Sequence, residues 1–379
     1  MENFISLLEQ ENLSVDQIAR ILSCSSDEDI EALRFQAEKV TIKTVSPAVY
    51  FRGLIELSNI CSLDCYYCGI RRSNRNIRRY TLSRDEVLSA AMECVEMGYG
   101  SVVLQSGERT DDAFVDYIED LINAIKTHSR SERLPEGLAI TLSIGEQSEK
   151  ALERFFKAGA HRYLLRIETS DPDLFARIHP ADQSFEKRLS CLRSLREIGF
   201  MVGTGVMIGL PGQTLEMLAR DILFFRDEKV DMIGMGPYIV HPDTPLANTQ
   251  DFTKEYLFRL SLNMISVCRL VCPAVNIAST TALETLYPEG RLMGIAHGAN
   301  VVMPCHTPLS KSCDYNLYKG KSRLNRDNGD SWENFLGAVK SLGHTPSFHA
   351  WGDSLHFLKR SGKLTCASDI TVCRELLPE

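Results

Sequence analysis

Three cysteines stand close together in the stretch CSLDCYYC, at residues 61–68, with the spacing Cys-x3-Cys-x2-Cys. A structural zinc ion takes four ligands and a disulfide needs cysteines in pairs, so the triplet leaves either site incomplete. Three thiolates can instead hold three irons of a 4Fe-4S cube, because sulfur ligands suit iron and such cubes take one cysteine per iron. The open fourth iron could then bind a small molecule and pass it an electron. Cys61, Cys65 and Cys68 therefore predict a 4Fe-4S cluster with one open iron.

Two other interpretations of the triplet remain open at this point. The cysteines could be a chance group of buried thiols, or part of a zinc site completed by a distant histidine or cysteine. Tyr66 and Tyr67 lie beside the last cysteine, where an aromatic ring can shield a cluster or simply pack within the loop.

The elements that must position these cysteines form a repeated pattern from Tyr50 onward, in which a short apolar strand precedes a capped amphipathic helix. We expect strands at residues 51–57, 101–105, 139–143, 162–167, 202–207, 232–238, 276–279 and 301–303. Helices are expected between them, as at residues 83–98, 111–126, 148–160, 184–199 and 255–270. Eight such units predict an α/β fold, a (β/α)8 TIM-type barrel, with an open doubly wound sheet as the alternative. The cysteines would follow the first strand, at the carboxyl end where barrels carry their active sites.

The chain divides into three parts on the same pattern. Residues 1–49 predict an N-terminal helical cap, because SVDQ and SSDED offer capping residues before apolar positions at helical spacing. Residues 50–304 form the predicted barrel. Residues 305–379 show no clear strand and helix rhythm, so we expect an irregular segment packed beside or across one end of the barrel.

Composition narrows the classes of function. The net charge of −8 and pI near 5.7 disfavour a nucleic-acid partner, since no general positive field would attract phosphates. No apolar run is long enough to cross a bilayer, and the acidic start MENFISLLEQENLS does not resemble a secretion signal, so we expect a cytoplasmic protein without a membrane partner. The twelve cysteines are then mostly reduced thiols, and small-molecule chemistry is the default.

The cysteine motif, with an aromatic residue before its last cysteine, resembles the signature of the radical S-adenosylmethionine enzymes. Longer stretches resemble the HydE-type FeFe-hydrogenase maturases, a family related to biotin synthase, from about Tyr50 to Tyr318: YFRGLIELSNIC, YYCGIRRSN, VVLQSGE, TLSIGE, RYLLRIET, SFEKRLSCL, GLPGQT, GPYIVHPDTPLAN, TTAL and GANVVMP. The resemblance implies an enzyme that cleaves S-adenosylmethionine reductively to a 5′-deoxyadenosyl radical. It also implies a small-molecule substrate, either an iron, carbonyl, cyanide and cysteine species or a cysteine-derived compound, and other hydrogenase maturases as partners.

The resemblance further implies roles for residues near the ends of the predicted strands. Those expected to bind S-adenosylmethionine, or to line the lumen beside it, are Tyr67, Gln105, Ser143, Glu168, Arg188 and Tyr238. Those expected to bind substrate are Thr280, Thr281, Tyr315 and Tyr318. Simpler alternatives are salt bridges at the rim for Glu168 and Arg188, a helix cap for the threonines and ordinary packing for the last two tyrosines.

The chain departs from parts of the family pattern. Some HydE-type proteins carry three further cysteines after the barrel, but here no cysteine follows Tyr318 until Cys366, so we expect a single cluster. We interpret Cys305, Cys313 and Cys366 as core thiols, and leave the role of Cys373 open.

Two alternative functions and one partner complete the prediction. A mutase or synthase of the methylornithine synthase or biotin synthase type is the enzymatic alternative, although the extra cluster ligands of biotin synthase are missing. A non-catalytic iron–sulfur protein is the other. Five arginines in RRSNRNIRRY, residues 71–80, predict either a solvated loop or a docking patch for reduced flavodoxin or ferredoxin.

Overall fold

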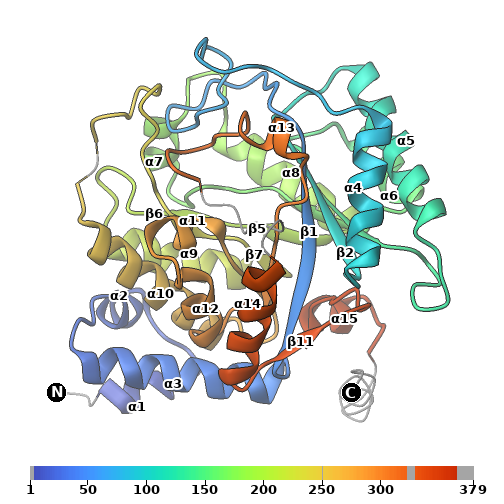
Figure 1. The fold of residues 1–379 in the computed structure, drawn as a ribbon. Coiled ribbons are helices and arrows are strands. Elements are labelled where there is room, and N and C mark those ends of the chain that lie inside the picture. The colour runs from blue at the N-terminus through green and yellow to red at the C-terminus, as the bar shows by residue number, and fades with distance from the viewer. Residues whose placement is uncertain (1–3, 250, 322–328, 365–379) are drawn as a thin grey trace.

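Eight parallel strands close into a barrel in the computed structural model of the chain, which describes residues 4–249, 251–321 and 329–364 (Figure 1). The strands, in their order around the barrel, are β1 (Ala48–Ser58), β2 (Ser101–Ser106), β3 (Ala139–Ser143), β4 (Arg162–Leu164), β5 (Met201–Thr204), β7 (Met232–Ile233), β9 (Asn276–Ser279) and β10 (Val301–Val302). β10 pairs back onto β1, with Tyr50 opposite Val301, and this pairing closes the ring. The closed ring confirms the predicted (β/α)8 barrel over an open sheet.

Helices surround the barrel, and most of them bury an apolar face against the strands (Figure 1). They are α4 (Arg84–Glu96), α5 (Asp112–His128), α6 (Glu149–Ala158), α7 (Pro172–Ile178), α8 (Phe185–Ile198), α9 (Leu215–Asp227), α10 (Lys254–Val271), α11 (Thr281–Leu286) and α12 (Gly290–Ala296). Their starts follow from local sequence, since Ser83 and Glu86 form a capping box on α4 and Ser148 caps α6. No helix in the described residues is both long and apolar enough to cross a membrane.

Four of the predicted strands end earlier than expected: β4 ends at Leu164 and β10 at Val302, and β5 and β7 also end early. β5 stops at Thr204 and β7 at Ile233, and the chain then forms a separate pair, β6 (Met207–Ile208) with β8 (Gly236–Pro237). The two backbones approach closely between these pairs, because a Cβ on Gly205 would lie 1.8 Å from the carbonyl oxygen of Gly234. The glycines therefore allow the wall of the barrel to change direction just below its carboxyl end.

Three helices precede the barrel, as the sequence predicts: α1 (Phe4–Leu8), α2 (Val15–Leu22) and α3 (Asp27–Thr44). Ser14 forms a capping box with Gln17, and Ser26 caps α3 through the amide of Asp29. α2 packs on α9 and α3 packs on α10, so these helices lie against the outside of the barrel and away from its carboxyl end (Figure 1).

The segment after residue 304 covers both ends of the barrel and is more regular than expected. It contains α13 (Leu309–Ser312), α14 (Gly329–Ser341), β11 (Thr345–Ser347) and α15 (Leu355–Arg360). The apolar spacing of α14, at Trp332, Phe335, Leu336 and Val339, is helical and could have been recognised. Cys366 and Cys373 lie outside the described residues.

The amino end of the barrel is closed by the stretch from β11 to α15. β11 pairs in parallel with the start of β1, and the following loop brings Asp353 within 2.6 Å of the buried Arg162 guanidinium. The Gly352 carbonyl accepts a hydrogen bond from Arg52 at 3.0 Å. Among the described residues, this stretch thus covers the amino end of the barrel, opposite the carboxyl ends of the strands.

Candidate active site

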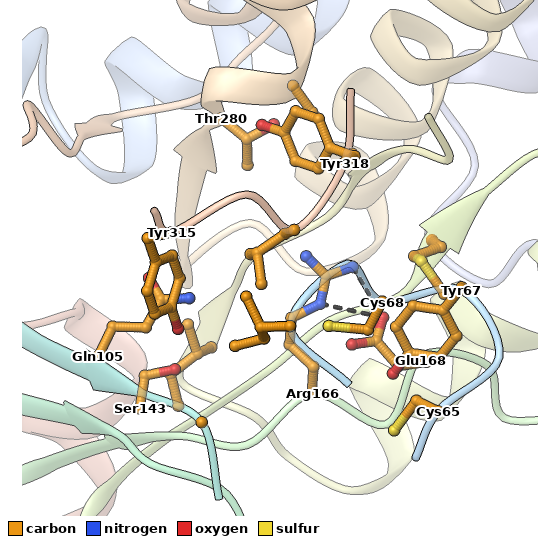
Figure 2. A pocket seen from close by; sticks show the side chains of 18 of the residues that line it. Cys65, Tyr67, Cys68, Gln105, Ser143, Arg166, Glu168, Thr280, Tyr315 and Tyr318 are labelled. Carbon is orange, nitrogen blue, oxygen red and sulfur yellow. Dashed lines mark hydrogen bonds and ion pairs between the residues drawn. The ribbon is translucent and has the colours of Figure 1, made fainter. Parts of the chain in front are cut away.

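A cavity of about 310 Å³ lies inside the carboxyl end of the barrel. All thirteen residues predicted from the sequence as cluster, cofactor or substrate residues line it: Cys61, Cys65, Tyr67, Cys68, Gln105, Ser143, Glu168, Arg188, Tyr238, Thr280, Thr281, Tyr315 and Tyr318. Figure 2 shows Cys65, Tyr67, Cys68 and Glu168 gathered on one side, with Gln105, Ser143 and Tyr315 on another. The cavity thus has a cysteine side and a distal polar side.

The three cysteines lie on a loop that follows Ser58 of β1. Asn59, at the start of this loop, forms hydrogen bonds to residues at its end. The Asn59 side chain donates to the carbonyl of Arg78 at 2.8 Å and accepts from the amide of Tyr80 at 2.8 Å. It also donates to the carbonyl of Asp314 at 2.7 Å. A single buried amide therefore joins the two ends of the loop and the segment that crosses above it.

Arg79 holds the middle of the same loop. Its guanidinium donates to the carbonyl oxygens of Asn59, Ile70, Arg71, Arg72 and Asn74. Hydrogen bonds from a charged donor are stronger than neutral ones, so these bonds fix the curved backbone around the cysteines. Sequence reasoning placed Arg79 in a surface patch, and nothing in its spacing indicated this structural role.

The arginines of residues 71–80 therefore divide into two groups. Arg71 pairs with Asp64 at 2.7 Å, and Arg79 points into the loop. The remaining Arg72, Arg75 and Arg78 are exposed beside the cysteine loop.

Cys65 is buried, Cys61 and Cys68 are partly buried, and N–H donors lie close to the sulfurs of Cys61 and Cys65. The amides of Leu63 and Glu108 each lie 3.4 Å from the Cys61 sulfur, and the side-chain amide of Gln183 lies 3.4 Å from the Cys65 sulfur. Burial raises the pKa of the Cys65 thiol to about 11, and it also raises the pKa of Cys61 and Cys68. The free thiols are thus protonated at neutral pH, and metal binding must displace their protons.

This donor set fits an iron–sulfur cube. Three sulfurs face one cavity, and N–H groups directed at sulfur stabilise ligating thiolates. In the described part of the chain no three His, Cys, Asp or Glu side chains are arranged to hold one metal ion together. A cube does not require such an arrangement, because each thiolate binds a different iron.

An acidic and basic network borders the cysteine side. Arg188 donates from Nε to Glu146 at 2.7 Å and from Nη1 to the carbonyl of Arg166 at 2.9 Å. The Glu146 amide donates to the Glu108 carboxylate at 2.7 Å. Burial raises the pKa of Glu108 to about 7, although the charge of Arg188 opposes this rise. Glu108 and Glu146 end the stretches VVLQSGE and TLSIGE, so the sequence placed both near the carboxyl ends of predicted strands but did not indicate these hydrogen bonds.

Glu168 is held in an uncommon conformation in the segment that follows β4. Its φ is 66°, in the left-handed region that residues other than glycine rarely adopt. Arg166 pairs with its carboxylate at 2.9 Å, and Figure 2 shows Arg166 between the two sides of the cavity. The salt-bridge alternative is therefore realised for Glu168 and for Arg188, while both side chains still line the cavity.

The two threonines at the start of α11 differ in their surroundings, and Figure 2 shows Thr280 beside Tyr318. Thr280 begins α11 without a side-chain capping bond, and its buried hydroxyl has no hydrogen-bond partner among the described residues. The Thr281 hydroxyl, by contrast, accepts a hydrogen bond from Arg291 at 3.0 Å. The Thr280 hydroxyl is thus available to a ligand, and the helix-cap alternative does not hold for it.

The segment of residues 305–321, here called the strap, crosses the carboxyl end of the barrel and contributes Tyr315, Tyr318 and Lys321 to the cavity wall (Figure 1). Lys321 forms an ion pair with Glu56, a fully buried residue of β1. The Glu56 carboxylate also lies 3.3 Å from the Thr307 hydroxyl and 3.8 Å from the Cys305 sulfur. Sequence reasoning missed this pair because its two residues are far apart in the chain.

A parallel barrel with a loop of three cysteines facing its carboxyl-end cavity is the arrangement of radical S-adenosylmethionine enzymes. The sequence profile of the Radical SAM superfamily matches residues 55–225. The chain is 42% identical over 315 residues to the [FeFe] hydrogenase maturase subunit HydE of Thermotoga maritima, covering 83% of this chain and 86% of that protein. The chain therefore belongs to the HydE family, and it is a radical S-adenosylmethionine enzyme.

More distant relatives share the fold. The 3-methylornithine synthase of Methanosarcina acetivorans is 26% identical over 317 residues, covering 82% of this chain and 85% of that protein. The crystal structure of methylornithine synthase (PylB) aligns with a TM-score of 0.74 at 22% identity, covering 92% of this chain and 98% of that one.

Proposed function

We propose that the cavity binds a 4Fe-4S cluster with one open iron through Cys61, Cys65 and Cys68, and binds S-adenosylmethionine beside it. Such a cluster supplies the electron that cleaves the S–C5′ bond of S-adenosylmethionine. The observation that carries the proposal is the convergence on one cavity of three thiols, two of them close to N–H donors, and ten further predicted site residues.

The chain's own residues would orient S-adenosylmethionine on the cysteine side. The carboxylate of Glu168 can accept hydrogen bonds from the ribose hydroxyls or the amine, and Arg188 presents a guanidinium for the carboxylate. Tyr67 and Tyr238 are further proposed contacts, and Gln105 and Ser143 would reach S-adenosylmethionine from the distal polar side of the cavity. The barrel wall and the strap both line the cavity, so a bound ligand would be shielded from water on these sides.

We further propose that the substrate is a small iron, carbonyl, cyanide and cysteine species or a cysteine-derived compound, processed during assembly of an FeFe-hydrogenase together with other maturases. The relationship to the Thermotoga maritima hydrogenase maturase subunit supports this role. The distal side offers the hydroxyls of Thr280, Thr281, Tyr315 and Tyr318 as substrate contacts. The free Thr280 hydroxyl is the most direct candidate.

Product analysis after anaerobic reconstitution tests the first proposal. With iron, sulfide, dithionite and S-adenosylmethionine, the wild-type chain should form 5′-deoxyadenosine. Cys65→Ala should abolish both the cluster absorbance and this product, whereas Cys313→Ser, which replaces an exposed cysteine of the strap, should retain both. Zinc in the anaerobically purified protein, or a cluster that persists in Cys65→Ala, would refute the assignment.

Activation of an immature FeFe-hydrogenase by a maturation extract lacking its HydE component tests the biological role. Addition of the active chain should restore hydrogen evolution, and the Thr280→Val variant should restore less of it.

The relationship to 3-methylornithine synthase favours an amino-acid mutase as the second candidate. Formation of 3-methylornithine, without any restoration of hydrogenase activity, would support that candidate instead.

We also propose that Arg72, Arg75 and Arg78 dock a reduced flavodoxin or ferredoxin. The support is their exposure beside the cysteine loop on a chain with a net charge of −8. Replacing all three by glutamate should slow reduction by flavodoxin but leave reduction by dithionite unchanged. Equal rates with flavodoxin before and after replacement would exclude this docking surface.

A further inference from the structure

The end of α7 and the turn that follows it contact three consecutive residues of the cysteine loop. The Tyr66 amide donates to the carbonyl of Ile178 at 3.0 Å. Tyr67 lies next to His179, with 3.3 Å between the hydroxyl oxygen and Nε2. The Gln183 side-chain nitrogen lies 3.4 Å from the Cys65 sulfur. A segment that the sequence did not connect with the cluster therefore packs along one side of its loop.

The turn holds Gln183 in place. The backbone N–H of Gln183 donates a hydrogen bond to the carbonyl of Pro180 at 3.0 Å. The His179 ring stacks on Phe175 with 3.9 Å between ring centroids, and its Nδ1 lies 2.9 Å from the Phe175 carbonyl oxygen. Because a carbonyl only accepts, Nδ1 carries the hydrogen and Nε2 accepts from the Tyr67 hydroxyl. The turn and the loop are thus joined by oriented hydrogen bonds.

Cys65 differs from Cys61 in the origin of its donor. The N–H groups near the Cys61 sulfur belong to the backbone of Leu63 and Glu108, so only proline could remove them. The Cys65 sulfur instead faces side chains, the amide of Gln183 and the hydroxyl of Tyr67. A protonated thiol could donate to the Gln183 oxygen, which lies 3.5 Å away, but a thiolate only accepts. A metal-bound Cys65 would therefore receive the Nε2 hydrogen.

We propose that Gln183 is a positioning residue that sets the reduction potential of the cluster through a hydrogen bond to the Cys65 sulfur. Reduction places additional negative charge on the cluster and its sulfurs, and a hydrogen-bond donor stabilises the more negative state. Gln183 thereby makes the cluster easier to reduce. This inference rests on the proposed cluster at Cys61, Cys65 and Cys68, but it does not depend on the identity of the substrate.

An electron paramagnetic resonance redox titration of the reconstituted chain, without S-adenosylmethionine, tests the inference. Gln183→Leu removes the donor, and Gln183→Asn shortens the side chain so that its amide no longer reaches the sulfur. Both should lower the equilibrium constant for reduction about tenfold, equivalent to about 59 mV for one electron. Asp182→Asn is the matched control, because this exposed neighbour loses a negative charge and any shift should have the opposite sign.

The outcomes separate this inference from the proposed function. A midpoint equal to that of the wild type, in either Gln183 variant loaded with four irons, would overturn the role of Gln183 and leave the cluster assignment intact. Failure of both variants to bind iron at an unchanged melting temperature would also overturn it, since Gln183 would then serve cluster retention. Failure of the wild-type chain to form any cluster would instead refute the proposed site.

Discussion

Substitution of Glu108 by glutamine tests the electrostatics of the cavity through the stability of the metal-free chain. Burial raises the pKa of Glu108 from 4.5 to about 7, so the folded state binds a proton more tightly than the unfolded state. Between these two values stability falls as the pH rises, because the unfolded chain releases its proton first. A difference of about 2.5 pKa units corresponds to roughly 3 kcal/mol. Above pH 7 the folded state carries this full cost, and below pH 4.5 it carries none.

Glu108→Gln removes the titration while keeping an oxygen that can accept the Glu146 amide. Urea unfolding at pH 8 should show the variant more stable than the wild type by roughly 3 kcal/mol, and the gain should decline toward zero near pH 5. Glu132→Gln, at an exposed loop position, is the control and should change stability little at either pH. An equal gain for Glu108→Gln at pH 5 and pH 8 would refute the reasoning, because a packing effect does not depend on proton binding.

Three further substitutions address the loop and the two ends of the barrel. Arg79→Ala should reduce iron binding, measured by metal analysis after reconstitution, because five carbonyls lose their donor, whereas exposed Arg75→Ala should load normally. Lys321→Met should lower the free energy of unfolding in urea by about 3–5 kcal/mol, because it leaves Glu56 buried without its cation. The double variant with Glu56→Gln should recover most of this loss. Asp353→Asn should lower the melting temperature, because it leaves the guanidinium it neutralises buried, and an unchanged value would contradict that account.

The barrel could be predicted because each of its units carries its own local signals. β3 and β9 begin and end at the predicted residues, where apolar runs are bounded by turn and capping residues. The split between β5 and β6 could not be predicted in this way, because it depends on the contact of Gly205 with Gly234 across the barrel wall. Local patterns thus determine which elements form, and contacts between distant segments determine where they stop.

Much of the site could also be located from the sequence, since residues at the carboxyl ends of parallel strands must meet in a barrel. The hydrogen-bond and ion-pair partners of those residues could not be predicted from the sequence in the same way. Arg188, on α8, pairs with Glu146, and Cys65 contacts Gln183. Glu146, Cys65 and Gln183 lie in loops, and the path of a loop has no periodic signal in the sequence. The same limit applies to Lys321, whose side chain reaches β1 from the strap. Sequence position predicted which residues line the cavity but not which of them pair.

The strap and the cysteine loop depend on each other. The Gly69 amide of the loop donates to the carbonyl of Leu317 at 2.9 Å, and the Asn59 side chain donates to that of Asp314 at 2.7 Å. The approach is close, because a Cβ on Gly69 would lie 2.1 Å from the carbonyl oxygen of Asn316.

A cluster that orders the loop should therefore also order the strap, and by thermodynamic reciprocity a docked strap should raise the affinity of the loop for iron. Gly69→Ala would force the strap away without touching a cysteine. Weakened iron binding in that variant would establish the coupling. Unchanged iron binding, together with faster hydrogen exchange in the strap, would show that the loop binds its cluster independently of the closure of the cavity.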